Sequence, residues 1–112
     1  MKYYYSLRIE TEDNMKDDID RILGVTNNMA DVDWGLEIFP DENNMGFDFI
    51  DYFTGILRNK FDKLESIGVL RENISIWMLY EYDEQCNMEF RPEQLIKIGA
   101  EKITLCISCW ES

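Results

Sequence analysis

The chain contains no histidine, and this limits the chemistry that its side chains can perform. Histidine is the usual general base near neutral pH and the commonest zinc ligand. Its absence excludes Ser–His and Cys–His nucleophilic schemes and most zinc enzymes. We therefore expect a protein that is not an enzyme and that holds neither a cofactor nor a metal ion.

The three cysteines, Cys86, Cys106 and Cys109, lie in the last quarter of the chain. Cys106 and Cys109 have the C-x2-C spacing of zinc knuckles and redox motifs, but they belong to an alternating segment that is typical of a strand. Residues three apart on a strand point to opposite faces, which disfavours a shared metal ion. We expect Cys109 in the core, Cys106 half-exposed, and all three thiols reduced and metal-free.

The segment 31–42 resembles a calcium-binding loop because its first, third and twelfth residues are acidic. Leu36 occupies the sixth position, where the sharp turn of such a loop needs glycine. The alternation of Trp34, Leu36 and Ile38 is typical of a strand instead. We therefore expect no calcium site here.

A long stretch of the chain carries negative charge without compensating bases. Between Arg21 and Arg58 there is no lysine or arginine, whereas acidic residues recur throughout. Such a stretch is either a surface that keeps the protein soluble or a landing site for a basic partner. The candidate partner-binding acids are Asp31, Asp33, Asp41, Glu42, Asp48 and Asp51.

The polar and apolar pattern predicts the elements that must position these residues. Strands are expected at 2–10, 32–38, 74–81 and 103–110, with a further short antiparallel strand at 86–90. Helices are expected at 15–23, 48–67 and 92–98. Their predicted N-caps are Asn14 and Asp48, with Pro92 in the first turn of the last helix and Gly24, Gly68 and Gly99 at the three ends.

The predicted elements define one α+β domain over residues 1–112, in the order β-α-β-α-β-α-β. We expect a single mixed sheet of four or five strands, with about three helices packed mainly on one face. The strand at 74–81 is expected to be central, and the one at 32–38 to lie near an edge. Core residues are expected to include Leu7, Phe53, Leu57, Phe61, Ile76, Leu95, Ile96, Ile98, Ile103, Leu105, Ile107 and Cys109.

The opposite face of the sheet would be partly open and would carry Tyr4, Arg8, Trp77, Leu79, Cys106 and Trp110. Tryptophan is enriched among interface anchors, so Trp77 and Trp110 are candidate partner-binding residues. In an alternative reading, Tyr4, Arg8, Trp77 and Trp110 bind a small ligand, and the arginine holds a carboxylate or phosphate. A closed pocket would favour the ligand, whereas a flat surface would favour a protein partner.

Acidic residues outnumber basic ones by 23 to 11, which gives a formal net charge of −12. This charge disfavours nucleic acid as a direct ligand, because binding would add repulsion and release few counterions. No apolar run approaches the length of a membrane span, and the first residues lack the apolar run of a signal peptide. We expect a cytoplasmic protein that binds neither nucleic acid nor a membrane.

Several segments together resemble the domain of unknown function 4279 family. These segments are YYYSLRIE, ILG, WGLEIF, QCNMEFRPEQLIKIG and ITLCISCW. The most specific part is the tail, from Gln85 to Phe90 and from Ile103 to Trp110. The resemblance implies a small bacterial α+β protein without assigned activity, with some relatives among toxin–immunity genes, and it implies no catalytic residues.

The sequence therefore favours a non-enzymatic protein-interaction domain, and an immunity-type binder of a basic partner protein is its most specific form. The alternative is a small-ligand-binding or enzymatic domain that uses the open face around Arg8, Trp77 and Trp110. A homodimer formed through the same open face is a further alternative.

Overall fold

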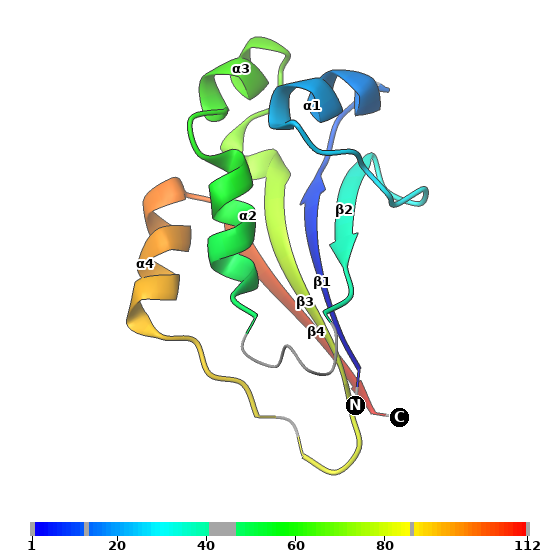
Figure 1. Ribbon diagram of the computed structural model, residues 1–112, viewed down its shortest axis with the longest axis vertical. Helices are drawn as coiled ribbons and strands as arrows, with labels where there is room; N and C mark the ends of the chain where they lie inside the picture. The colour runs from blue at the N-terminus through cyan, green and yellow to red at the C-terminus, as the bar shows by residue number, and fades with distance from the viewer. Residues whose placement is uncertain (1, 13, 41–46, 86, 112) are drawn as a thin grey trace.

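The computed structural model describes residues 2–12, 14–40, 47–85 and 87–111. In these described residues, four strands and four α-helices follow one another (Figure 1). They are β1 (Lys2–Ile9), α1 (Lys16–Leu23), β2 (Trp34–Ile38), α2 (Phe49–Leu57), α3 (Phe61–Ser66), β3 (Ile74–Tyr82), α4 (Pro92–Glu101) and β4 (Thr104–Glu111), with a 3-10 turn at Arg71–Asn73. The predicted α+β class is confirmed.

The strands form one mixed sheet in the order β2-β1-β3-β4. β1 is antiparallel to both β2 and β3, whereas β4 runs parallel to β3. Parallel strands need a crossover connection. α4 lies in this connection, which returns the chain to the end of the sheet at which β3 begins. The prediction that the third strand is central and the second lies at an edge is therefore confirmed.

The helices cover one face of the sheet. The strand register aligns Leu7 with Leu36 and Ile76, and Ile76 with Leu105, so these side chains share that face. The helices bury Ile19, Leu23, Phe49, Ile50, Phe53, Leu57, Leu64 and Ile98 in the same core. Figure 1 shows α2 and α4 lying along the sheet, with α1 and α3 at one end of it.

The predicted long helix over 48–67 is in fact two helices. α2 ends at Leu57, and Asn59 adopts a left-handed conformation with φ of 64°. A left-handed residue cannot continue a right-handed helix, so α3 starts in a new direction at Phe61. The predicted N-cap of this segment is confirmed. Asp48 precedes α2, and its side chain accepts a hydrogen bond from the Asp51 amide at 3.0 Å.

Two helix ends also differ from expectation. The N-cap of α1 is Met15 rather than Asn14, and it makes no side-chain capping bond. α4 continues past Gly99 and ends at Glu101. Lys102 caps this end in a left-handed conformation with φ of 56°, and its amide bonds back to the Gly99 carbonyl. The end of α1 at Gly24, with φ of 74°, is as predicted.

The short strand expected at 86–90 is absent from the described residues 87–90, and Cys86 lies outside the described residues. Met88 and Phe90 pack instead at the margin of the core, where the Phe90 ring lies 6.3 Å from that of Phe49. The apolar residues of this segment thus contribute to side-chain packing, not to strand pairing.

Four apolar residues expected in the core lie at the surface. Leu95 is 51% exposed, Ile96 is 67% exposed and Ile107 is 44% exposed, and Cys109 is also exposed. α4 turns Gln94 and Ile98 inward, so Leu95 and Ile96 are left outside. Ile107 and Cys109 are exposed because β4 is an edge strand with no further strand beside it among the described residues.

Candidate functional site

The face of the sheet opposite the helices carries alternate residues of all four strands. The register pairs Arg8 with Gly35 and Ser75, Ser6 with Glu37 and Trp77, Tyr4 with Leu79, Ser75 with Thr104, Trp77 with Cys106, Leu79 with Ser108 and Glu81 with Trp110. We call this surface the open face. The six residues expected on such a face, which are Tyr4, Arg8, Trp77, Leu79, Cys106 and Trp110, all lie on it.

Arg8 and Trp77 form a close pair on the open face. The guanidinium carbon of Arg8 lies 4.3 Å from the centroid of the Trp77 ring, which is the geometry of a cation–π interaction. The Arg8 Nε donates a hydrogen bond to the Oγ of the buried Ser6 at 3.1 Å. The Trp77 indole donates to the Ser75 Oγ at 2.8 Å. The protein itself therefore holds this arginine against the ring.

A second group of rings crosses the sheet. The ring centroid of Tyr4 on β1 lies 5.0 Å from that of Phe39, which follows the end of β2. It lies 6.0 Å from the ring centroid of Trp110 on β4. Phe39 is 64% exposed, and Tyr4 and Trp110 are half-buried. We call these three residues the aromatic strip. It extends from one edge of the open face to the other.

Sequence reasoning did not include Phe39 in the candidate site. The strand predicted at 32–38 ends one residue before Phe39, so Phe39 was not assigned to the sheet. Its position in the alternation with Gly35 and Glu37 was a usable signal, because every second residue of a strand points to the same face.

Arg8, Trp77 and Trp110 do not converge on one point. Trp77 pairs in the register with Cys106, which lies four residues before Trp110 on the same strand. At about 3.3 Å per residue, the two tryptophans are separated by roughly 13 Å along the sheet. Trp77 contacts Arg8, whereas Trp110 contacts Tyr4, so the two tryptophans belong to separate clusters.

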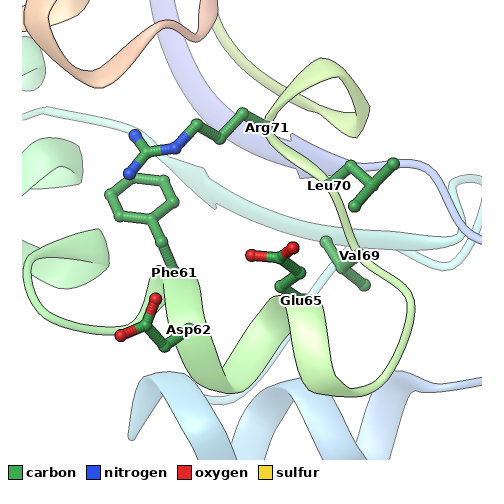
Figure 2. A pocket seen from close by; sticks show the side chains of 6 residues that line it. All are labelled: Phe61, Asp62, Glu65, Val69, Leu70 and Arg71. Carbon is green, nitrogen blue, oxygen red and sulfur yellow. The ribbon is translucent and has the colours of Figure 1, made fainter.

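A small hollow lies elsewhere on the molecule, between α3 and the segment that leads to β3 (Figure 2). Its volume is about 230 Å³, and its lining residues are Phe61, Asp62, Glu65, Val69, Leu70 and Arg71. The Arg71 guanidinium lies 3.8 Å from the centroid of Phe61 and donates hydrogen bonds to Glu101. This arginine thus joins α3 to the end of α4, and the hollow includes no residue of the open face.

The candidate partner-binding acids lie in two places. Asp31 and Asp33 precede β2, near the end of the sheet where α1 lies, and the Asp33 carboxylate accepts a hydrogen bond from the Thr11 amide at 3.0 Å. Asp48 and Asp51 lie at the start of α2, beyond the other end of β2 (Figure 1). Asp41 and Glu42 lie outside the described residues. The four described acids therefore do not form one cluster.

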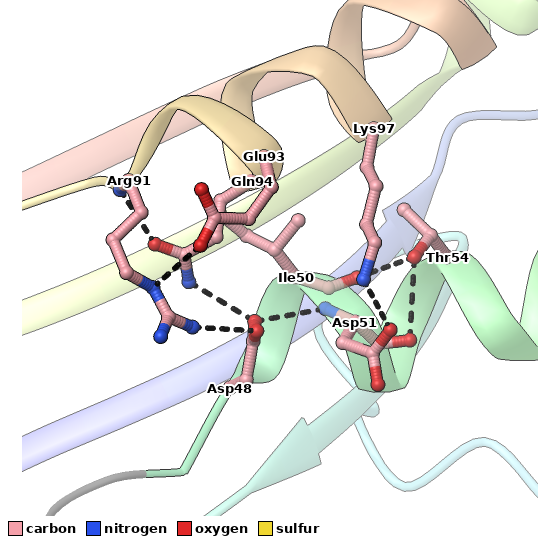
Figure 3. A network of polar contacts seen from close by, with 8 residues as sticks. All are labelled: Asp48, Ile50, Asp51, Thr54, Arg91, Glu93, Gln94 and Lys97. Carbon is pink, nitrogen blue, oxygen red and sulfur yellow. Dashed lines mark hydrogen bonds and ion pairs between the residues drawn. The ribbon is translucent and has the colours of Figure 1, made fainter.

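Asp48 and Asp51 connect α2 to α4 (Figure 3). The Asp48 carboxylate accepts a hydrogen bond from Gln94 at 3.1 Å and lies 3.4 Å from the Arg91 guanidinium, and Lys97 lies 2.5 Å from the Asp51 carboxylate. Partial burial acts to raise the pKa of Asp48. Hydrogen bonds from Asp51 and Gln94, with the charges of Lys97 and Arg91, outweigh that effect and lower the pKa below its ordinary value.

No family model, curated protein or solved structure matches the chain. In the described ranges, no helix is long and apolar enough to cross a membrane. No group of three or more His, Cys, Asp or Glu side chains in that part of the chain is arranged to hold a metal ion.

Proposed function

We propose that this chain is a non-enzymatic protein-interaction domain that binds a basic partner protein through its open face. The aromatic strip is the observation that carries this proposal. Tyrosine, tryptophan and phenylalanine are enriched at the centres of protein interfaces, and tryptophan and tyrosine are frequent hot spots. Here Tyr4 contacts both Phe39 and Trp110 on a sheet face that the described helices do not cover.

The charge of the molecule favours a basic partner. The chain has a formal net charge of −12, which would attract a positively charged protein from a distance and speed its association. Glu37 and Glu81 lie on the open face itself, where Glu81 is the register partner of Trp110. A partner with lysine or arginine around an apolar centre would complement this arrangement.

The small-ligand alternative has less support. A binding site for a carboxylate or phosphate would need the Arg8 guanidinium to point into a concave space shared with both tryptophans. Instead the guanidinium lies over Trp77, and Trp110 packs against Tyr4. The immunity-type role, which the family resemblance implies, remains a more specific form of the proposal.

Affinity capture with a matched variant tests the proposal. Extract of the source cells is passed over immobilised wild-type chain and over Trp110→Ser. Each protein retained by the wild type is then purified and titrated by calorimetry against both the wild type and the variant. We expect a positively charged protein whose affinity falls at least tenfold with Trp110→Ser, since truncating an interface anchor typically costs about 2 kcal/mol or more.

Leu70→Ser is the control for this experiment, because Leu70 is an exposed apolar residue outside the open face. Its affinity for the same partner should equal that of the wild type, and circular dichroism should show that both variants are folded. A partner that binds Trp110→Ser as tightly as the wild type would contradict the proposal. So would a set of retained proteins that are all acidic.

A further inference from the structure

Arg8 uses only part of its hydrogen-bonding capacity on the open face. Its Nε donates to the Oγ of the buried Ser6, and its guanidinium carbon lies over the Trp77 ring. An arginine side chain has five N–H donors, four of them on its two terminal Nη atoms. In the part of the chain that the structure describes, no oxygen accepts a hydrogen bond from either Nη atom. Arg8 is therefore held in place, while the donors that pair with a carboxylate stay free.

Acidic residues lie beside Arg8 without pairing with it. Glu10 follows Arg8 by two residues in the sequence. Gly35 is the register partner of Arg8, and Asp33 and Glu37 stand two residues before and after Gly35. In the described ranges, none of these three carboxylates forms an ion pair or a hydrogen bond with the guanidinium. This region thus presents one positive group flanked by negative ones.

We propose that Arg8 anchors a carboxylate of the partner protein, and that lysine or arginine residues surround this carboxylate on the partner's surface. The inference rests on the proposed function, because it assigns one specific contact of the same open face. The basic residues of the partner would face Glu10, Asp33 and Glu37, so both signs of charge would be matched across the interface.

The charge of the chain selects a carboxylate that belongs to a basic protein. A free acid or a phosphate group would be repelled by the net charge of −12 and by the acids beside Arg8. A carboxylate within a positively charged surface approaches together with its neighbours, whose attraction outweighs that repulsion. The contact also selects among basic proteins, since a basic surface without a carboxylate would leave the Arg8 donors unpaired in the interface.

The contacts that Arg8 makes within the protein favour such an anchor. A flexible arginine loses rotamer freedom when a partner immobilises it, and this loss opposes binding. In the unbound protein, the Ser6 hydrogen bond and the Trp77 ring already restrict Arg8. Because Ser6 occupies the Nε donor, the incoming carboxylate pairs with the two Nη atoms, one oxygen to each.

Two blocked peptides, Lys-Lys-Glu-Lys-Lys and Lys-Lys-Gln-Lys-Lys, test the anchor on the full chain. Nuclear magnetic resonance follows the Arg8 Nε–H and the Trp77 indole N–H as each peptide is added. We expect the glutamate peptide to bind roughly tenfold tighter at these signals, because only this peptide offers a carboxylate to the guanidinium. The glutamine peptide carries one more net positive charge, so attraction by the net charge alone predicts the opposite order.

Substitutions of Arg8 assign the preference to its side chain. In Arg8→Gln, the Trp77 signal should report equal or tighter binding of the glutamine peptide. Arg8→Lys keeps the charge but lacks the planar fork, so the preference for the glutamate peptide should fall roughly threefold or more. Arg58→Gln is the matched control and should retain the wild-type preference, because Arg58 is an exposed arginine just after α2 and outside the open face.

The outcomes separate the anchor from the proposed function. A wild type that binds the glutamine peptide at least as tightly as the glutamate peptide would overturn the anchor, and so would an unchanged preference in Arg8→Gln. For the partner obtained by affinity capture, Arg8→Gln should weaken binding roughly tenfold or more. A partner that loses affinity with Trp110→Ser but not with Arg8→Gln would overturn the anchor and leave the proposed function intact.

Discussion

The Asp20 carboxylate holds together three parts of the chain. It accepts hydrogen bonds from the Asn27 amide at 2.9 Å, from the Asn27 side chain at 3.0 Å and from the indole of the buried Trp34 at 2.8 Å. Partial burial acts to raise the pKa of Asp20. These hydrogen bonds, with the charge of Lys16, outweigh that effect and lower the pKa below its ordinary value.

Replacing Asp20 with alanine should destabilise the protein. The buried indole N–H of Trp34 would lose its acceptor, which typically costs about 1–3 kcal/mol. Urea unfolding followed by tryptophan fluorescence measures the change. Asp18→Ala is the control: in the part of the chain that the structure describes, Asp18 makes an exposed ion pair with Arg21, so the free energy of unfolding should change by no more than about 0.5 kcal/mol. Equal losses for the two variants would show that the Asp20 bonds contribute nothing.

The lowered pKa values of Asp20 and Asp48 predict a loss of stability in acid. A carboxyl with a lower pKa in the folded state binds its proton more readily in the unfolded chain, so protonation favours unfolding. This stabilisation is complete above the unfolded pKa of about 4 and is lost as the pH falls through the lower folded-state values. Urea midpoints measured towards pH 2 should fall for the wild type and fall less for Asp20→Ala.

At the scale of single elements, the strands were predictable because alternation is a local signal. Tyr3, Tyr5, Leu7 and Ile9 identify β1 and its buried face without reference to the rest of the chain. The same argument places Tyr4 and Arg8 on the opposite face. The strand order was not predictable, because it depends on which elements pack against each other across the whole domain.

Two errors at the helices have a tertiary cause. Asn59 is compatible with a helix by residue type, but in the fold its backbone is left-handed and that of Arg58 before it is extended, with ψ of 127°, and these two residues separate α2 from α3. Leu95 and Ile96 were expected in the core by their apolarity. In the folded molecule Gln94 takes the buried position, because its amide bonds to Asp48 on α2.

Leu57→Ala tests the placement of α2 against the sheet. Leu57 is fully buried among core residues, so we expect a loss of about 2–5 kcal/mol in the free energy of unfolding. The control is Leu95→Ala on α4, which removes the same atoms from an exposed position and should change stability by about 0.5 kcal/mol or less. A thermal melt of Leu57→Ala that coincides with the wild type would show that α2 does not pack as described.

At the scale of the whole molecule, the net charge should control the rate at which the partner protein binds. Exposed charges are screened over about 10 Å at an ionic strength of 0.1 M, so added salt should slow association steeply and change dissociation much less. Surface plasmon resonance separates the two rates. Trp110→Ser should mainly raise the dissociation rate, because it would remove a contact of the proposed interface.

Neutralising Asp41 and Glu42 together, by Asp41→Asn and Glu42→Gln, should lower the association rate and leave the free energy of unfolding unchanged. If neither added salt nor this double substitution changes the association rate, the acidic stretch only keeps the protein soluble.

The candidate site was partly predictable for the same reason as the strands. Alternation alone grouped Tyr4, Trp77 and Trp110 on one face. It did not show that Arg8 lies over Trp77 while Trp110 packs against Tyr4, because those contacts depend on which strands are neighbours. The sequence pattern also did not show that Asp31 and Asp33 lie apart from Asp48 and Asp51, because all four belong to one stretch without basic residues.

The strand register has a consequence for how the chain reaches its native state. Leu7 pairs with Leu36, and Ile76 with Leu105, each across about 30 positions, whereas Leu7 pairs with Ile76 across about 70. Closing the longer loop costs roughly 0.8 kcal/mol more in chain entropy. The β1–β2 and β3–β4 halves are therefore expected to form early and to dock along β1 and β3 late. Substitutions at that seam should consequently accelerate unfolding more than they slow folding.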